Sequence, residues 1–137
     1  MKILVSACLL GRNCKYNGGN NYSPAVIKYA EGHEVIPVCP EVLAGLGTPR
    51  IPIEIVSGEV MTKDGRSVDQ VLRQAVSQII KEHPDADCAI LKSRSPTCGV
   101  KQVYDGTFSG VLRDGSGILA QALKDAGINV TDSEDIQ

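Results

Sequence analysis

The segment Ile3-Leu4-Val5-Ser6-Ala7 is a short apolar run that leads directly into Cys8, and it is typical of a buried β-strand. Two later runs are also followed by cysteines: residues 35–38 precede Cys39, and residues 88–91 precede the turn that carries Cys98. Short runs with little alternation indicate parallel strands that are covered on both faces. Because ligands of open α/β sheets bind outside the carboxyl ends of the strands, we expect these three cysteines to meet at one edge of one sheet.

Helical patterns separate the strands. Ser23 followed by a proline is a typical helix start. The apolar residues after Val68 recur at i, i+3 and i+4, as on the buried face of a helix, and Ser67 with Gln70 resembles a capping box. We expect helices over residues 24–32, 68–81 and 117–126.

Further strands are expected between these helices. The first strand covers residues 2–7, and others follow at residues 34–38, 87–92 and 128–130. A short turn of helix should follow Pro40, and residues 51–56 resemble an edge strand because Pro52 cannot donate to a central ladder. Strands that alternate with helices predict an α/β fold: a single Rossmann-like domain over residues 1–137, with a mainly parallel sheet and helices on both faces.

Composition narrows the classes of function. The formal net charge is −2 and the Lys and Arg residues form no run, so binding to a nucleic acid polymer is not expected. No stretch approaches the ~20 apolar residues of a membrane span, and residues 1–5 pass too soon into polar loop sequence for a signal peptide. We therefore expect a cytoplasmic protein, without a membrane partner, that binds a small molecule.

The five cysteines are better explained by metal binding, catalysis or burial than by disulfides, because the count is odd and the expected compartment is reducing. Cys8, Cys39 and Cys98, each at a strand end, form a candidate metal or cluster site. Cys14 either completes a four-thiolate site with Cys8 or is an exposed thiol. Cys88, inside an apolar strand, is expected to be a small buried side chain.

Two other residues share the loops of these cysteines. Glu41 lies two positions after Cys39 and is a candidate general base; alternatively it only begins a helix, where the dipole favours a carboxylate. Ser95 precedes Pro96, which stiffens the turn and fixes its direction. A hydroxyl held in this way can hydrogen-bond a bound ligand, or it can cap the turn.

Five separated motifs remain to be explained: Ser6-Ala7-Cys8-Leu9-Leu10-Gly11, Cys39-Pro40-Glu41-Val42, Gly45-Leu46-Gly47-Thr48-Pro49-Arg50, Lys92-Ser93-Arg94-Ser95-Pro96-Thr97-Cys98-Gly99 and Tyr104-Asp105-Gly106-Thr107-Phe108-Ser109-Gly110. These motifs resemble those of the thiouracil desulfurase family, small bacterial proteins that were long classified as a domain of unknown function. They cover nearly the whole chain in the family's order. The chain departs from the family at Lys15 and Asn17, where an Arg and an Asp are usual.

The resemblance implies a 4Fe-4S cluster held by three cysteines, Cys8, Cys39 and Cys98, with one iron free for a small-molecule thiolated substrate such as thiouracil. It also implies catalytic roles for Glu41 and Ser95 in an iron–sulfur-dependent desulfurase, which would convert a thiocarbonyl to a carbonyl and release sulfide. The residues alone leave a second hypothesis open: a non-catalytic iron–sulfur or zinc binding protein, acting as a sensor or carrier.

Overall fold

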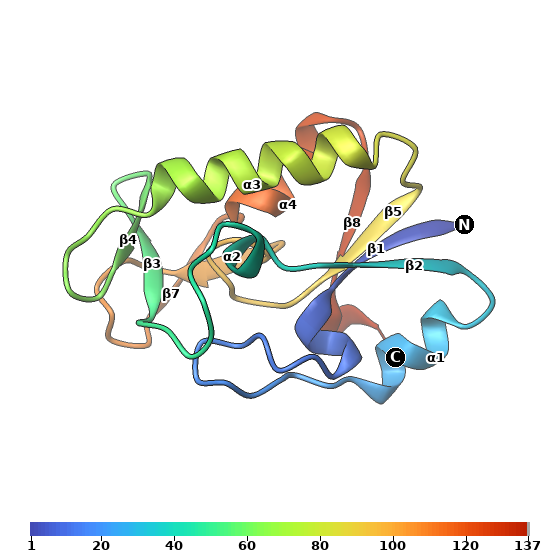
Figure 1. Cartoon of the computed structure of the whole chain (residues 1–137), viewed down its shortest axis with the longest axis horizontal. Helices are drawn as coiled ribbons and strands as arrows, with labels where there is room; N and C mark the ends of the chain where they lie inside the picture. The colour runs from blue at the N-terminus through green and yellow to red at the C-terminus, as the bar shows by residue number, and fades with distance from the viewer. Residues whose placement is uncertain (137) are drawn as a thin grey trace.

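A parallel four-stranded sheet forms the centre of the protein (Figure 1), and the computed structural model describes residues 1–136. Its strand order is β2-β1-β5-β8, and every neighbouring pair is parallel. The strands are β1 (Lys2–Ser6), β2 (Glu34–Val38), β5 (Cys88–Leu91) and β8 (Asn129–Asp132). The predicted α/β fold with a parallel sheet is therefore confirmed, and the carboxyl ends of all four strands lie at one edge.

Helices cover both faces of the sheet. Figure 1 shows α3 (Asp69–Glu82) and α4 (Ile118–Asp125) above it, and α1 (Pro24–Ala30) below it. The short 3-10 helices are η1 (Ala7–Leu10), directly after β1, and η2 (Ser133–Asp135), directly after β8; a short α-helix, α2 (Pro40–Leu43), follows β2. Among residues 1–136, no helix is long and apolar enough to cross a membrane.

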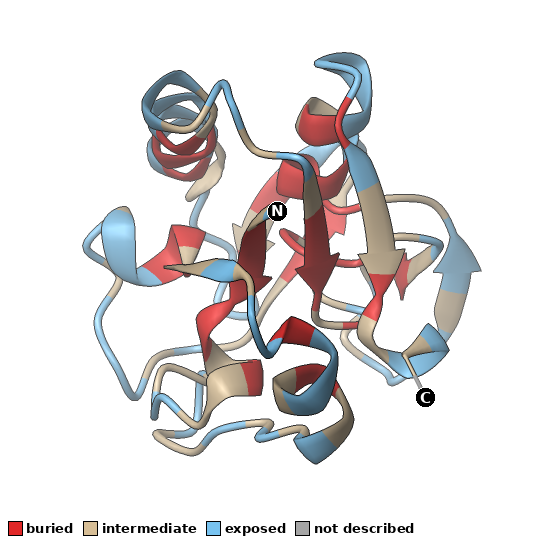
Figure 2. Cartoon of the chain, turned by 90° about the vertical axis from the view of Figure 1, so that its right-hand side faces the viewer, coloured by how far each residue is buried: buried red, intermediate tan, exposed pale blue. Residues whose placement is uncertain are grey.

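Alternate residues of each strand serve the two faces of the sheet. Leu4 and Leu91 pack in the cluster under α3 and α4, whereas Ile3 and Val5 pack with Val26 of α1. These side chains are fully buried, as Figure 2 shows by the red strands at the centre of the molecule. Burial of an aliphatic side chain of this size typically contributes about 1.5–3 kcal/mol to the free energy of folding, so the packing on both faces stabilises the sheet.

Two small antiparallel sheets lie beside the central one. The stretch expected as an edge strand forms β3 (Ile53–Val56), which pairs with β4 (Glu59–Thr62) in a sheet of its own. The second small sheet joins β6 (Gln102–Tyr104) to β7 (Leu112–Asp114) and was not predicted, because three-residue strands carry too little periodicity to be recognised.

The helix starts differ in how well the sequence predicts them. Ser23 Oγ accepts the Val26 N–H at 3.3 Å, which confirms the expected cap of α1. The capping box expected at α3 is wrong, since Val68 occupies the cap position and Ser67 Oγ accepts only the Asp69 N–H, at 3.5 Å. Instead, Asp69 Oδ1 accepts the Val60 N–H at 3.0 Å, so the first turn of α3 is tied to β4.

Candidate functional site

The sequence-predicted site residues line one cavity of about 490 Å³ at the carboxyl ends of β1, β2 and β5. Cys8 lies in η1, Cys39 follows β2, and Cys98 lies in the loop after β5. The other lining residues from the sequence analysis are Glu41, Ser95 and Cys14. The fold therefore brings four thiols, a carboxylate and a hydroxyl from distant parts of the sequence to one place.

The thiols of Cys8, Cys39 and Cys98 are reduced and shielded from water to different degrees. Burial, and then the nearby charge of Glu41, raise the pKa of the Cys98 thiol to about 12. The same two causes raise the pKa of Cys39, and burial raises the pKa of Cys8 against an opposing hydrogen bond from Asn21. Since metals bind the thiolate, loading this site must release protons from these cysteines.

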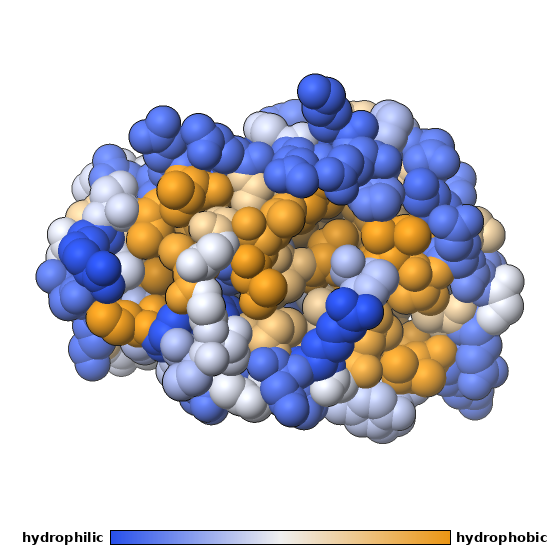
Figure 3. Space-filling model, viewed as in Figure 1, coloured by the Kyte–Doolittle hydropathy of each residue, from blue (hydrophilic) through white to orange (hydrophobic). Residues whose placement is uncertain are grey.

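Glu41 is buried in a short helix that exposes its apolar side chains instead. The Glu41 side chain is only 7% exposed, whereas Val42 and Leu43 of the same short helix, α2, are 47% and 45% exposed. Figure 3 shows the apolar surface that gathers over the middle of this face, where α2 lies. A helix placed only by the hydrophobic effect would show the opposite pattern, so the buried carboxylate indicates a functional constraint.

Both oxygens of Glu41 have partners. Thr97 Oγ1 donates to Oε1 at 2.5 Å, and the Cys39 thiol lies 3.5 Å from Oε2. Ser95 Oγ accepts the backbone N–H groups of Thr97 and Cys98, each at 3.1 Å. Ser95 therefore caps its turn, which is one of the two interpretations from sequence, and it also lines the cavity.

The loop that carries Ser95 and Cys98 packs tightly against the start of α4. A Cβ added at Gly117 would lie 2.4 Å from the Thr97 carbonyl carbon and 2.8 Å from the Cys98 nitrogen. Backbone hydrogen bonds close the contact: the Leu119 N–H donates to the Thr97 oxygen at 2.8 Å. Only glycine permits this approach, so α4 fixes the position of the third cysteine.

Gly117→Ala is expected to destabilise the protein by about 1–3 kcal/mol, because the new methyl group must displace backbone atoms rather than a mobile side chain. Thermal unfolding of the cluster-free protein measures the effect. Gly19→Ala is the matched control, since the atom nearest its Cβ is the side-chain oxygen of Asn17 at 3.1 Å. Equal unfolding midpoints for the two variants would contradict the tight contact.

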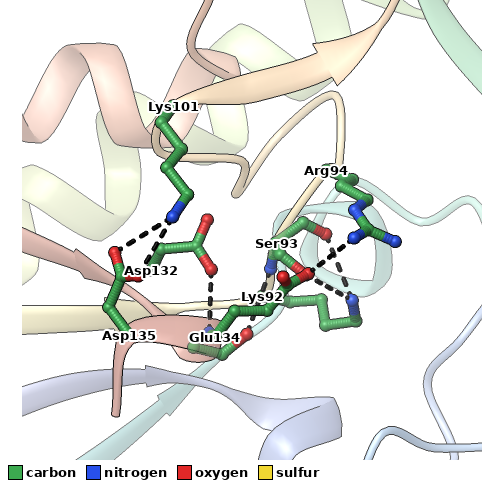
Figure 4. A network of polar contacts seen from close by, with 8 residues as sticks. Lys92, Ser93, Arg94, Lys101, Asp132, Glu134 and Asp135 are labelled. Atoms are coloured by element: carbon green, nitrogen blue, oxygen red, sulfur yellow. Dashed lines mark hydrogen bonds and ion pairs between the residues drawn. The ribbon is translucent and has the colours of Figure 1, made fainter. Parts of the chain in front are cut away.

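Residues of η2 contact the segment that contains the same loop (Figure 4). Arg94 pairs with Glu134 at 3.2 Å, Lys101 pairs with Asp135 at 3.0 Å, and the Ser93 N–H donates to the Ser133 hydroxyl at 3.2 Å. Each exposed ion pair contributes at most about 1 kcal/mol. Together they connect both ends of the segment between β5 and β6 to η2.

Sequence reasoning missed a second buried carboxylate, Glu54 in β3. It is 8% exposed, and its Oε1 accepts the N–H groups of Gly106 at 2.9 Å and Phe108 at 3.1 Å. Phe108 has a φ of 55° and lines the cavity together with Tyr104 and Tyr16. Glu54 thus holds an aromatic loop at the cavity. Its signal in the sequence is a carboxylate inside an otherwise apolar strand.

Cationic side chains also line the cavity, although the whole chain is slightly acidic. They are Lys15, Arg50, Lys63, Lys92 and Arg94. The two lining carboxylates, Glu41 and Glu54, are both engaged in hydrogen bonds. The electrostatic potential from these five cations therefore favours a ligand that carries negative charge or develops it during a reaction.

The donor set fits a cluster of several irons. Four cysteines, Cys8, Cys14, Cys39 and Cys98, line one cavity, and soft sulfur donors of this kind are the ligand type that iron–sulfur clusters use. Among residues 1–136, no three His, Cys, Asp or Glu side chains converge on a position for a single metal ion. Cys88 lies in β5 and is not among the residues that line the cavity.

The fold and the site define a class of α/β protein with a cysteine-lined cavity at the carboxyl edge of a parallel sheet. The chain belongs to the 2-thiouracil desulfurase family, whose model matches residues 3–135. It is 35% identical to the uncharacterized protein YbbK of Bacillus subtilis (strain 168), over 98% of this chain and 97% of YbbK. A solved structure of TudS, described as a 4Fe-4S-dependent thiouracil desulfidase, matches with a TM-score of 0.91 and 32% identity, over 98% of this chain and 92% of TudS. The resemblance inferred from the motifs is confirmed.

Proposed function

We propose that this protein is an iron–sulfur-dependent desulfurase that removes sulfur from a thiolated nucleobase such as thiouracil or from a similar thioamide. The observation that carries the proposal is the convergence of four thiols, a buried carboxylate and a hydroxyl on one cavity. Membership of the 2-thiouracil desulfurase family and the likeness to TudS support the same reaction.

Cys8, Cys39 and Cys98 would hold the 4Fe-4S cluster. When bound by three thiolates, such a cluster supplies an iron with an open coordination position, a soft Lewis acid suited to a thiocarbonyl sulfur. A cavity of about 490 Å³ lies within the range of about 300–1,000 Å³ that is typical of small-ligand sites. Tyr104 and Phe108 offer aromatic surface on which a flat heterocycle can pack.

Glu41 would act as the general base of the reaction. It takes a proton from water, whose oxygen forms a bond to the thiocarbonyl carbon. The carbon–sulfur bond breaks as the new hydroxyl gives its remaining proton to the sulfur, which leaves as hydrosulfide while the carbonyl forms; Glu41 then returns the first proton to the hydrosulfide. Ser95 would orient the substrate through a hydrogen bond that its hydroxyl donates in place of the contact with Thr97 seen in the substrate-free protein. The sum is thiocarbonyl plus water giving carbonyl plus hydrogen sulfide, with no net transfer of electrons.

The cationic side chains at the cavity would stabilise the negative charge that develops as the sulfur departs. A site that depends on reduced cysteines suits the cytoplasm, where disulfides are rare. We therefore place the reaction there, with residues 1–137 acting as one domain.

Anaerobic reconstitution with iron and sulfide tests the proposal. We expect a brown protein with about four irons and four sulfides per chain, and release of sulfide with formation of uracil when 2-thiouracil is added. A colourless protein that binds only zinc would contradict the cofactor. A brown protein that holds its cluster but converts no thiolated base would identify a carrier or sensor instead.

A further inference from the structure

Thr97 lies between the two residues proposed to be catalytic, although it is not among the residues that line the cavity. Its hydroxyl is 2.5 Å from Glu41 Oε1 and 2.9 Å from Ser95 Oγ. The side chain is fully buried, with 0% exposure. Thr97 therefore contacts both functional groups from behind the cavity wall, where it cannot touch a substrate.

The direction of these hydrogen bonds follows from the number of protons available. Thr97 has one hydroxyl proton and two acceptors within reach, Glu41 Oε1 at 2.5 Å and the Cys98 sulfur at 3.7 Å; the much shorter contact assigns the proton to the carboxylate, which can only accept it. The contact between Ser95 and Thr97 must then be donated by Ser95. Ser95 Oγ already accepts the N–H groups of Thr97 and Cys98, so its proton and both of its lone pairs are assigned. Thr97 thus orients the hydroxyl of Ser95 as well as the carboxylate.

The second carboxylate oxygen has a different neighbour. Glu41 Oε2 faces the sulfur of Cys39 at 3.5 Å. A cysteine that ligates iron is a thiolate and has no proton to donate. With Cys39 bound to metal, Thr97 is therefore the one hydrogen-bond donor of the carboxylate found among residues 1–136, and it holds Oε1 while Oε2 is left to act.

We propose that Thr97 is a positioning residue, which fixes the Glu41 carboxylate through Oε1 and the Ser95 hydroxyl through its proton. The role in turnover rests on the proposed desulfurase function. The hydrogen bonds themselves do not depend on that function, because they are formed in the protein without a cluster.

Thr97→Val tests the role, since valine preserves the shape of the side chain and removes only the hydroxyl. We expect kcat for desulfuration to fall about tenfold or more, with KM and the iron and sulfide content near those of the parent. Thr97→Ser retains the hydroxyl and should restore kcat to within about twofold of the parent. Loss of the cluster in Thr97→Val, or equal damage from both substitutions, would indicate a structural role and overturn the proposal.

A second measurement does not depend on activity. In the cluster-free protein, Thr97→Val should lower the midpoint of thermal unfolding by several degrees, because the buried carboxylate loses its donor. In a Glu41→Ala background, the same substitution should shift the midpoint much less. Equal shifts in the two backgrounds would overturn the proposal, even if the parent is active. An inactive parent with the expected coupling would contradict the desulfurase function and leave the hydrogen-bond assignment supported.

Discussion

Cys98→Ala protein, reconstituted anaerobically, will retain little iron or sulfide and will not release sulfide from 2-thiouracil. Cys98 is the most deeply buried of the four cavity thiols, and its loop is fixed by the glycine contact with α4, so the loop cannot shift to bring another ligand into its place. Substitution of residues that only support metal ligands already costs about 10–100-fold in affinity or activity. Removal of one of the three proposed ligands should lower the affinity for the cluster by more than this factor. Iron and sulfide analysis and the visible spectrum report the result.

Two other cysteines provide controls for this prediction. Cys88→Ala changes a thiol that lies in β5 and is not part of the cavity lining, so the cluster and the activity should remain. Cys14→Ala separates a three-thiolate from a four-thiolate site, because Cys14 faces the same cavity. Retention of the cluster in Cys14→Ala would support ligation by three cysteines. Normal iron content in Cys98→Ala would contradict the assignment.

The parts of the site at strand ends could be predicted from the sequence. Parallel topology obliges the carboxyl ends of β1, β2 and β5 to share an edge, so residues that follow these strands must meet. Cys8 and Cys39 come directly after their strands, and their convergence needs no knowledge of side-chain packing. Glu41 follows Cys39 so closely that its position is fixed with it.

The parts that depend on packing between loops could not be predicted. Residues 51–56 alternate as an edge strand should, yet Glu54 is buried with Ile55, while Ile51 is 39% exposed. Alternation identifies a strand but not its buried face when a carboxylate has a partner there. The partner of Glu54 is the backbone of Gly106 and Phe108, 52 and 54 positions later, and no local pattern in the sequence records this contact.

Thr97 illustrates the same limit inside a recognised motif. It stands between Ser95 and Cys98, where a threonine is an ordinary turn residue. Its importance depends on Glu41, 56 positions earlier, which only the crossover from β2 to β5 brings within hydrogen-bond distance. The sequence identifies residues whose side chains can take part in chemistry, whereas the fold determines which of them form hydrogen bonds with one another.

Glu41→Gln will retain the cluster and lose activity by about a hundredfold or more in kcat, because glutamine preserves the shape of the side chain but cannot accept a proton from water. If Glu41 only favoured the start of α2, the substitution would cost at most about 1 kcal/mol of stability and leave kcat near normal. The structure allows these two roles of Glu41 to be distinguished. The amide oxygen of the introduced glutamine can still accept the hydrogen bond from Thr97, so the local arrangement should survive the substitution.

Glu59→Gln is the matched control for this prediction, because it makes the same chemical change at an exposed position in β4, away from the cavity. It should leave kcat, KM and cluster content unchanged. Single-turnover measurements with cluster-loaded protein place the defect of Glu41→Gln in the chemical step rather than in substrate binding or product release. A cluster-loaded Glu41→Gln protein that desulfurates 2-thiouracil at close to the parental rate would remove Glu41 as the base. The water proton would then have to be taken by another group at the cavity, and Ser95, whose hydroxyl is already fully hydrogen-bonded, could not be that group without first breaking its contact with Thr97.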